Sequence, residues 1–228
     1  MPQESVWEKE YRHPQLVTKN DKPQKDVLRF LKFLRKNEGV ELEGLAILDL
    51  GSGTGRNANY LAKLGNNVTG IEISKTAIGL ARERAREDRV KVTYLQRSMG
   101  QSFPLNDTSV DLIFDVISSN SLNESEREMY LAECNRVLKP GGYMFVKALC
   151  KDGDKNAKAL LKDHPGSEPD TYINQDMGLT ERVFSRDDLS AVYKRYFSIL
   201  LMKSKTNYSR FKGQSYKRNF WLVFLKKI

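Results

Sequence analysis

The chain has 228 residues, enough for one α/β domain with a full hydrophobic core. Its composition, 39% hydrophobic and 29% charged, is that of a folded soluble protein and excludes an intrinsically disordered chain. No apolar run approaches the roughly 20 residues that span a bilayer, and the polar N-terminus lacks the order of a secretory signal. We therefore expect a cytoplasmic protein with no membrane partner.

The formal net charge of +9 is unevenly distributed along the chain. No acidic residue follows Asp188, whereas lysine and arginine recur from Lys194 to Lys227. Such a segment has two interpretations, an RNA-binding surface or a solvated basic face. The two cysteines, Cys134 and Cys150, form no C-x-x-C pair, so we expect no metal site and no disulfide framework.

Residues 1–22 are predicted to be irregular, and apolar residues then recur at helical spacing from Val27 to Leu34. Strands and helices alternate after that, which indicates a parallel sheet covered on both faces through right-handed crossovers. Ser74 is the predicted N-cap of the second of these helices. The predicted strands are 46–50, 67–73, 90–95, 110–117 and 143–149, and the predicted helices between them are 57–64, 75–88 and 124–138.

Residues 151–180 interrupt this alternation because glycine and proline recur in them. We expect an inserted loop with one short helix there, followed by a helix over 186–195 that Ser185 caps. The last two predicted strands are 197–203 and 220–225. The link between them is too short for a helical crossover, so we expect an antiparallel hairpin.

The loop Gly51-Ser52-Gly53-Thr54-Gly55 joins an apolar strand directly to a helix. Its glycines let the backbone turn sharply and let a ligand lie against it. Ligands bind at this carboxyl edge of parallel sheets, and the helix N-terminus favours an anionic group such as a carboxylate. Glu72 ends the next strand, 21 residues after Gly51, where a carboxylate can accept hydrogen bonds from both hydroxyls of a ribose. The pattern predicts a nucleoside-binding site.

The third glycine of the loop indicates which nucleoside binds. An NAD site has the pattern G-x-G-x-x-G, but Gly55 comes one residue early and Arg56 takes its place, which disfavours an NAD-dependent oxidoreductase. With Asp49 in the preceding strand, the segment resembles motif I of the class I (Rossmann-like) S-adenosylmethionine-dependent methyltransferases. Residues 109–115 resemble that family's fourth strand, and residues 136–142 resemble its turn into the fifth.

The resemblance implies an α/β fold, a seven-stranded, mostly parallel sheet with helices on both faces and a terminal antiparallel hairpin. It implies S-adenosyl-L-methionine as the cofactor and methyl transfer as the reaction. We expect a single methyltransferase domain over residues 1–228. Its parts would be an N-terminal lid and helix (1–44), a cofactor-binding core (45–150), an inserted substrate-side loop (151–184), and a helix with the C-terminal hairpin (185–228).

The same resemblance assigns the contacts to the cofactor. Asp49 would orient the glycine loop or the amino group of the cofactor. Glu72 would hold the ribose, with Ile73 against the adenine. The methionine part would lie on the loop residues Gly51, Ser52, Gly53 and Gly55.

Ser98 and Met99, after the third predicted strand, would meet the edge of the adenine. Many members of the family have Asp at the position of Ser98, so the contact would come from the Ser98 hydroxyl or the Met99 backbone. Asp115 and Val116, at the end of the fourth strand, would lie beneath the methyl-bearing sulfur.

Two residues are candidates for the substrate side. Tyr11 is a predicted lid residue, the alternative being a surface-packed aromatic side chain. Asn120 is predicted to orient the substrate or only to lead into a helix. Many relatives have a His shortly after the fourth strand, but residues 117–122 contain none, so we nominate no catalytic base. The reaction would be an in-line displacement that depends mainly on alignment.

The class of methyl acceptor is indicated by missing motifs. The chain has no Asn-Pro-Pro-Tyr, Asp-Pro-Pro-Tyr or Pro-Cys, which are typical of enzymes that methylate nucleic-acid bases. We expect a small-molecule acceptor in a pocket roofed by residues 1–20 and 151–184. A non-catalytic nucleotide-binding module is one alternative.

The other alternative is an RNA or protein methyltransferase that uses the C-terminal segment. Aromatic and basic residues interleave there, which suits base stacking and phosphate contact. A hairpin that turns its aromatic side chains into the core has the same pattern. The residues are Tyr208, Phe211, Tyr216 and Trp221 with Arg210, Lys212, Lys217 and Arg218.

Overall fold

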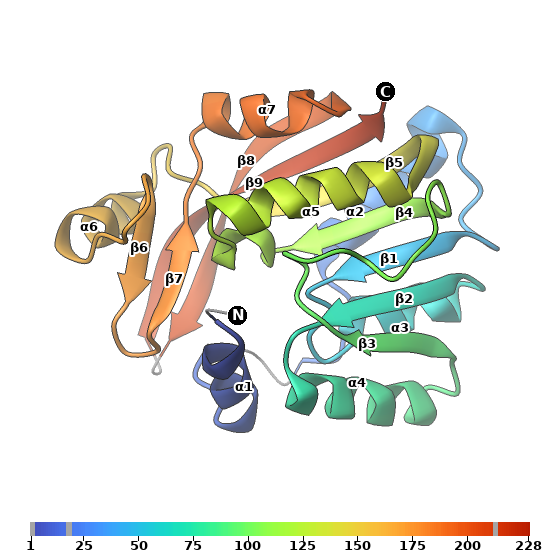
Figure 1. Ribbon diagram of the computed structural model, residues 1–228, viewed down its shortest axis with the longest axis horizontal. Coiled ribbons are helices and arrows are strands. Elements are labelled where there is room, and N and C mark those ends of the chain that lie inside the picture. Colours follow the sequence, from blue (N-terminus) through green and yellow to red (C-terminus); the bar gives the residue numbers. More distant parts are fainter. Residues whose placement is uncertain (1–2, 17–19, 212–213) are drawn as a thin grey trace.

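The structure is built on a seven-stranded sheet (Figure 1). The computed structural model describes residues 3–16, 20–211 and 214–228, without the side chains of 209–211. The strands are β1 (Ala46–Leu50), β2 (Asn67–Glu72), β3 (Val92–Gln96), β4 (Val110–Val116), β5 (Leu138–Leu149), β8 (Phe197–Phe211) and β9 (Gln214–Lys227). Their order is β3-β2-β1-β4-β5-β9-β8, and only the pairs that involve β9 are antiparallel. The predicted fold class is therefore confirmed.

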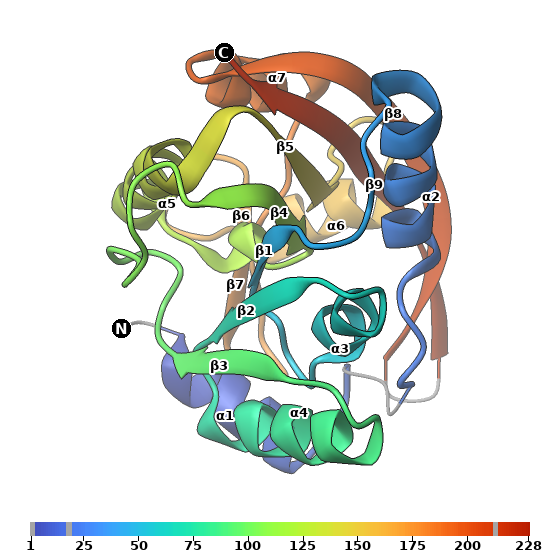
Figure 2. The same ribbon diagram turned by 90° about the vertical axis from the view of Figure 1, so that its right-hand side faces the viewer.

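Helices cover both faces of this sheet (Figure 2). Side chains alternate between the faces along each strand, so Leu112 and Phe114 of β4 pack on one side and Ile113 on the other. None of the helices described is both long and apolar enough to cross a membrane. On the first side lie α2 (Lys25–Phe33), α3 (Arg56–Lys63) and α4 (Lys75–Glu87), and on the second α5 (Glu124–Val137) and α7 (Arg186–Lys194).

Two segments are more regular than the sequence predicts. The N-terminal segment, predicted to be irregular, contains helix α1 (Glu4–Arg12). The predicted loop contains α6 (Lys155–Asp163) and also an antiparallel pair, β6 (Thr171–Asn174) and β7 (Leu179–Arg182). These strands have four residues each, too few to show a clear alternation of apolar and polar residues. Their existence depends on backbone pairing that the sequence pattern does not report.

The C-terminal hairpin is longer than predicted. β8 and β9 stay paired as far as Phe211 and Gln214, so the expected polar link is part of both strands. β9 pairs with β5 only from Lys226 to Phe220, which is opposite the last residue of β5. Residues 214–219 therefore project beyond the carboxyl end of β5, together with their partners on β8.

A buried ion cluster joins α2 to this hairpin. The Asp26 carboxylate is 2% exposed and accepts Lys147 Nζ from β5 at 3.0 Å and Lys205 Nζ from β8 at 2.7 Å. Burial raises the pKa of Asp26, but hydrogen bonds from Lys205 and Lys147 outweigh it and hold the pKa below its ordinary value. Burial also lowers the pKa of Lys147, which has Asp26 as its counter-ion.

Asp26→Asn would leave the Lys147 ammonium buried without a counter-ion. Removing one partner of a buried pair costs about 3–5 kcal/mol, so we expect the free energy of unfolding in urea to fall by that order. Lys205→Met is the control, because it keeps the Asp26–Lys147 pair and removes a side chain that is 23% exposed. We expect Lys205→Met to lower the free energy of unfolding by about 1 kcal/mol or less. Equal losses in the two variants would contradict the central role of Asp26.

Candidate functional site

A cavity of about 850 Å³ lies at the carboxyl ends of β1, β2 and β4. Those ends point toward β7, with α1 beside them (Figure 1), and residues of both elements line the cavity. Gly55, Asp115 and Asn120 lie outside its lining. The other residues singled out in the sequence do line it, namely Tyr11, Asp49, Gly51, Ser52, Gly53, Glu72, Ile73, Ser98, Met99 and Val116.

The glycine loop lines the cavity with backbone in left-handed conformations. The φ angle is 63° at Gly51 and 54° at Gly53. A Cβ atom at Gly53 would lie 2.7 Å from the Tyr11 hydroxyl, so a side chain has no room there. Gly55, with φ of 79°, instead turns the chain into α3, where a Cβ would overlap the Tyr94 side chain. Gly55 therefore has a structural role away from the cavity.

Glu72 braces the glycine loop from the end of β2. It is 5% exposed, and its Oε2 accepts the Gly53 N–H at 2.9 Å while Oε1 accepts the Ser74 N–H at 2.8 Å. Burial raises the pKa of Glu72, and these N–H donors oppose the rise. Each carboxylate oxygen has a second acceptor position. Two hydroxyl groups of a ligand can therefore bind without displacing the loop.

Asp49 is buried beside this loop with an unsatisfied oxygen. Its Oδ2 has no hydrogen-bond partner among the described residues, and the side chain is 2% exposed. Burial raises the pKa of Asp49 to about 7, with Arg56 opposing and Asp115 adding to the rise. A buried carboxylate oxygen without a partner is costly, so a cationic donor from a ligand would stabilise it. The ammonium group of an amino-acid ligand fits this requirement.

Comparison with known proteins shows which domain the residues around this site resemble. Residues 47–142 match a family model described as "Methyltransferase domain". The matched span contains the glycine loop and Glu72. These residues are therefore similar to a methyltransferase domain.

Curated methyltransferases are similar to this chain over part of its length. A ubiquinone biosynthesis O-methyltransferase from Nitrosococcus oceani is 36% identical over 142 residues, which cover 60% of this chain and 55% of that protein. One from Mesorhizobium japonicum is 34% identical over 120 residues, covering 52% of this chain and 45% of that protein. The chain spans about half the length of the curated relatives it matches.

Solved methyltransferase structures share the fold over most of the chain. An S-adenosylmethionine-dependent methyltransferase from Methanosarcina mazei has a TM-score of 0.75 at 22% identity and covers 91% of this chain and 99% of its own. The 1,6-didemethyltoxoflavin-N1-methyltransferase of Burkholderia thailandensis, with 1,6-didemethyltoxoflavin and S-adenosylhomocysteine bound, has a TM-score of 0.60 at 17% identity. It covers 89% of this chain and 78% of its own. At these identities the likeness establishes the fold.

Two residues predicted for the methyltransferase site hold the structure together instead. Asp115 is fully buried, and its oxygens accept the Ser118 N–H at 3.1 Å and the Tyr130 hydroxyl at 2.8 Å. It points toward α5, while Val116 on the other side of the strand lines the cavity. The Asn120 side chain is buried and accepts the Leu149 N–H at 3.0 Å, which ties the turn after β4 to β5.

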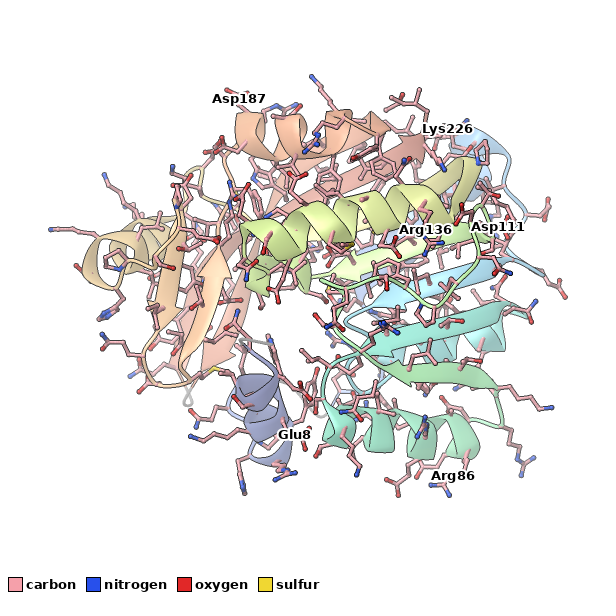
Figure 3. All side chains as sticks on the ribbon, in the orientation of Figure 1. Glu8, Arg86, Asp111, Arg136, Asp187 and Lys226 are labelled. Atoms are coloured by element: carbon pink, nitrogen blue, oxygen red, sulfur yellow. The ribbon has the colours of Figure 1, made fainter. Side chains whose placement is uncertain are left out.

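α1 lines the cavity and is held at its N-terminal end and near its middle. The Gln3 side chain accepts the Thr180 N–H of β7 at 2.8 Å. Glu8 lies beside the first turn of α4 (Figure 3), where it accepts the Ser74 hydroxyl at 2.7 Å and the Thr76 hydroxyl at 2.6 Å. Ser74 caps α4 as predicted, through the hydrogen bond from the Ala77 N–H to its Oγ. Tyr11 thus lies on a helix that covers the cavity and is held in place by β7 and α4.

The end of the cavity away from the glycine loop is lined by residues that the sequence reasoning missed. They lie after β4 and on β5, β7 and β9, so only the sheet topology brings them together. Among the described residues, no group of three or more His, Cys, Asp or Glu side chains is placed to hold a metal ion. The missed residues are Ile117, Lys147, Leu149, Glu181, Arg218 and Phe220.

The aromatic and basic residues of the hairpin divide between interior and surface. Arg218 is interior and donates to Asp154 Oδ2 at 3.2 Å. Trp221 is 4% exposed, whereas Tyr208 is 71% exposed. Trp221 thus packs into the core, as expected of an ordinary hairpin, while Tyr208 lies on the surface, as expected of an RNA-binding segment. The side chains of Arg210, Phe211 and Lys212 lie outside the described residues.

The pKa of Glu8 makes the docking of α1 sensitive to acid. Burial raises the pKa of Glu8, but hydrogen bonds from Thr76 and Ser74 outweigh it and lower the pKa from 4.5 to about 2. Because the folded-state pKa is depressed, the stabilisation is present above pH 4.5 and is lost as the pH falls toward 2. In a Trp221→Phe protein, we expect the Trp7 fluorescence to move to longer wavelength across that range.

Glu8→Gln in the same background should show the shifted Trp7 spectrum already at neutral pH. Glu4→Gln, a carboxylate change on the same helix, is the control and should behave as the parent protein. If the Trp7 fluorescence of the Glu8 variant still changed on acidification with the same midpoint pH, Glu8 would not be the group that holds α1.

Proposed function

We propose that this chain transfers the methyl group of S-adenosyl-L-methionine to a small-molecule acceptor bound in the same cavity. The proposal rests on the different linings of the two halves of the cavity. One half contains the glycine loop, Asp49 and Glu72, which suit an amino acid joined to a nucleoside. The other half has apolar walls at Leu149 and Phe220 and contains the ionisable Glu181. A volume of about 850 Å³ has room for two small ligands together.

The cofactor half fits S-adenosylmethionine residue by residue. In this proposal Gly51 and Gly53 hold the methionine part against their backbone. Oδ2 of Asp49, which has no partner among the described residues, accepts a hydrogen bond from the amino group. Each oxygen of Glu72 accepts one ribose hydroxyl in addition to its backbone N–H.

The adenine would lie between Ile73 and Met99, both at the cavity wall. Ser98 Oγ already accepts the Gly100 N–H at 3.1 Å, so its hydroxyl hydrogen is the group it can offer to an adenine nitrogen. Val116 would lie below the reacting centre.

The chain's main task in this reaction is alignment. Bound S-adenosylmethionine would supply an electrophilic methyl group on a cationic sulfur. The cavity walls hold the accepting atom in line with the carbon–sulfur bond, which lowers the barrier without a covalent intermediate on the protein. Trp7 and Tyr11 on α1 line the cavity and cover the reacting groups.

The names of the similar proteins support a small-molecule acceptor, because they include ubiquinone biosynthesis O-methyltransferases and a toxoflavin N1-methyltransferase. A non-catalytic nucleotide-binding module would have no use for the second half of the cavity. An RNA acceptor has less support, because Arg218, one of the basic residues of the hairpin, is largely buried and paired with Asp154. The division of the chain into lid, core, inserted segment and hairpin is part of the proposal, and the cytoplasmic location stays a prediction.

Calorimetric titration with S-adenosylmethionine and S-adenosylhomocysteine tests the proposal, with NAD as the ligand control. We expect micromolar binding of the first two. Glu72→Ala should weaken it at least about tenfold, because both the ribose contact and the Gly53 brace are lost. Glu83→Ala, at an exposed position of α4, is the matched control. No binding of either compound to the folded wild-type protein would exclude the methyltransferase function.

Asp49 should make the cofactor affinity depend on pH. Its pKa is raised to about 7, first by burial, and a ligand ammonium stabilises the ionised form. Below that pH a proton must leave on binding, so we expect the Kd of S-adenosylhomocysteine to rise up to about tenfold from pH 7 to pH 6. Asp49→Asn should bind more weakly and lose most of this dependence. A wild-type Kd that is constant between pH 6 and pH 8 would contradict the role of Asp49.

A further inference from the structure

The acceptor half of the cavity contains a buried carboxyl group that the cofactor contacts do not use. Glu181 is a residue of β7, the strand that lies opposite the carboxyl ends of β1 and β4 (Figure 1). It is 9% exposed and lines the cavity together with Ile117, Leu149 and Phe220. A carboxyl group among apolar walls is costly to ionise unless hydrogen bonds or cations compensate. The groups that contact it therefore decide its chemistry.

A chain of hydrogen bonds holds the Glu181 side chain in one orientation. Oε2 accepts the Tyr172 hydroxyl of β6 at 2.7 Å. The Tyr172 oxygen in turn accepts both terminal nitrogens of Arg218 at 3.3 Å, and Arg218 is anchored on Asp154. Among the described residues, no group bonds Oε1 of Glu181. That oxygen is the position at which a bound molecule can donate a hydrogen bond.

The other charged groups around the acceptor half already have partners. Lys147 is paired with Asp26, and Arg218 with Asp154. The Glu126 carboxylate, which also lines the cavity, completes the capping box at the start of α5. The capping box uses Oε2 of Glu126 and leaves Oε1 without a partner among the described residues, but Glu126 is only half-buried. Glu181 is the buried carboxylate of this half, so its open oxygen is the one enclosed by the apolar walls.

We propose that Glu181 is the catalytic base of the methyl transfer, and that the acceptor is a small, largely apolar molecule that presents a hydroxyl group to its Oε1. The inference rests on the proposed function and adds the class of acceptor and the destination of the proton. The apolar walls bury the body of such a molecule. A hydroxyl matches the open oxygen because it donates a hydrogen bond while neutral and becomes the nucleophile as it loses its proton.

The acceptor hydroxyl is methylated and deprotonated in the same step. The hydroxyl oxygen forms a bond to the methyl carbon while the carbon–sulfur bond breaks, and the electron pair of that bond stays on sulfur. The hydroxyl proton passes to Oε1, so the Glu181 carboxylate becomes a carboxylic acid. The products are a methyl ether and a neutral thioether, and the carboxylic acid returns its proton to solvent.

The surroundings of Glu181 change its pKa in two opposing ways. Burial raises the pKa of Glu181, and the Arg218 charge and the Tyr172 hydrogen bond oppose the rise. These two side chains, from β9 and β6, are the titratable groups that act on it. A base is most effective when its pKa lies near the working pH, which is the direction in which burial moves this carboxyl.

The test measures formation of S-adenosylhomocysteine from S-adenosylmethionine with catechol, phenol and 1-naphthol as acceptors, using the full chain. We expect methylation of at least one of these by the wild-type protein. Glu181→Gln should lower kcat about 10²–10⁴-fold, the range of general-base catalysis, with KM and cofactor affinity little changed. Asp163→Asn, an exposed carboxyl change at the end of α6, is the matched control and should keep wild-type kcat.

Tyr172→Phe supplies a second readout that a purely structural role would not move. It removes the hydrogen bond that lowers the pKa of Glu181, so the acid limb of the kcat–pH profile should move to higher pH. In Glu181→Gln that limb should disappear. Near-ultraviolet circular dichroism of both variants confirms that they fold.

The opposite results would contradict the base, the class of acceptor or the cofactor function separately. Wild-type kcat in Glu181→Gln, or an acid limb that Tyr172→Phe leaves in place, rules out Glu181 as the base. Tight cofactor binding without methylation of any hydroxyl compound overturns the class of acceptor and leaves the cofactor function standing. Absence of cofactor binding instead removes the proposed function itself.

Discussion

The buried carboxylate of Glu72 is the interaction on which the cofactor half and its roof both depend. It holds the Gly53 N–H of the glycine loop and the Ser74 N–H at the start of α4. Ser74 in turn donates its hydroxyl to Glu8 on α1. Loop, helix and roof are therefore connected by one chain of hydrogen bonds. A carboxylate is tolerated in this interior position because each of its oxygens is bonded, and a ligand's hydroxyls would add to those bonds.

The acceptor half depends on the antiparallel end of the sheet. β9 follows β5 to Phe220 and then projects past it, which carries Arg218 to the cavity. Asp26 ties the same hairpin to the parallel strands through Lys147 and Lys205. The acceptor walls thus come from Ile117, β5 and the elements after it, while the proposed cofactor contacts come from elements before β5. Such a division lets the acceptor half change without disturbing the glycine loop.

The sequence by itself determined the fold class and most of the residues that line the proposed cofactor half, because the features involved are local. The strand, the glycine loop and the following helix are adjacent in the chain, so their geometry follows from short-range constraints. Glu72 was within reach of the same reasoning, since it ends the next strand and parallel strands end at the same edge. The cap at Ser74 is local as well. These residues could be placed without knowledge of the remote parts of the chain.

Tertiary structure alone decided the rest. Asp115 and Asn120 were assigned to the site, but packing against Tyr130 and pairing with the β5 backbone turn their side chains away from the cavity. The spacing of residues along the chain does not predict which way these side chains point. Glu181 and its partner Tyr172 lie on strands too short to be recognised, and Arg218 reaches them through the register of β9 against β5. Their juxtaposition is a product of long-range backbone pairing, for which the sequence carries no local signal.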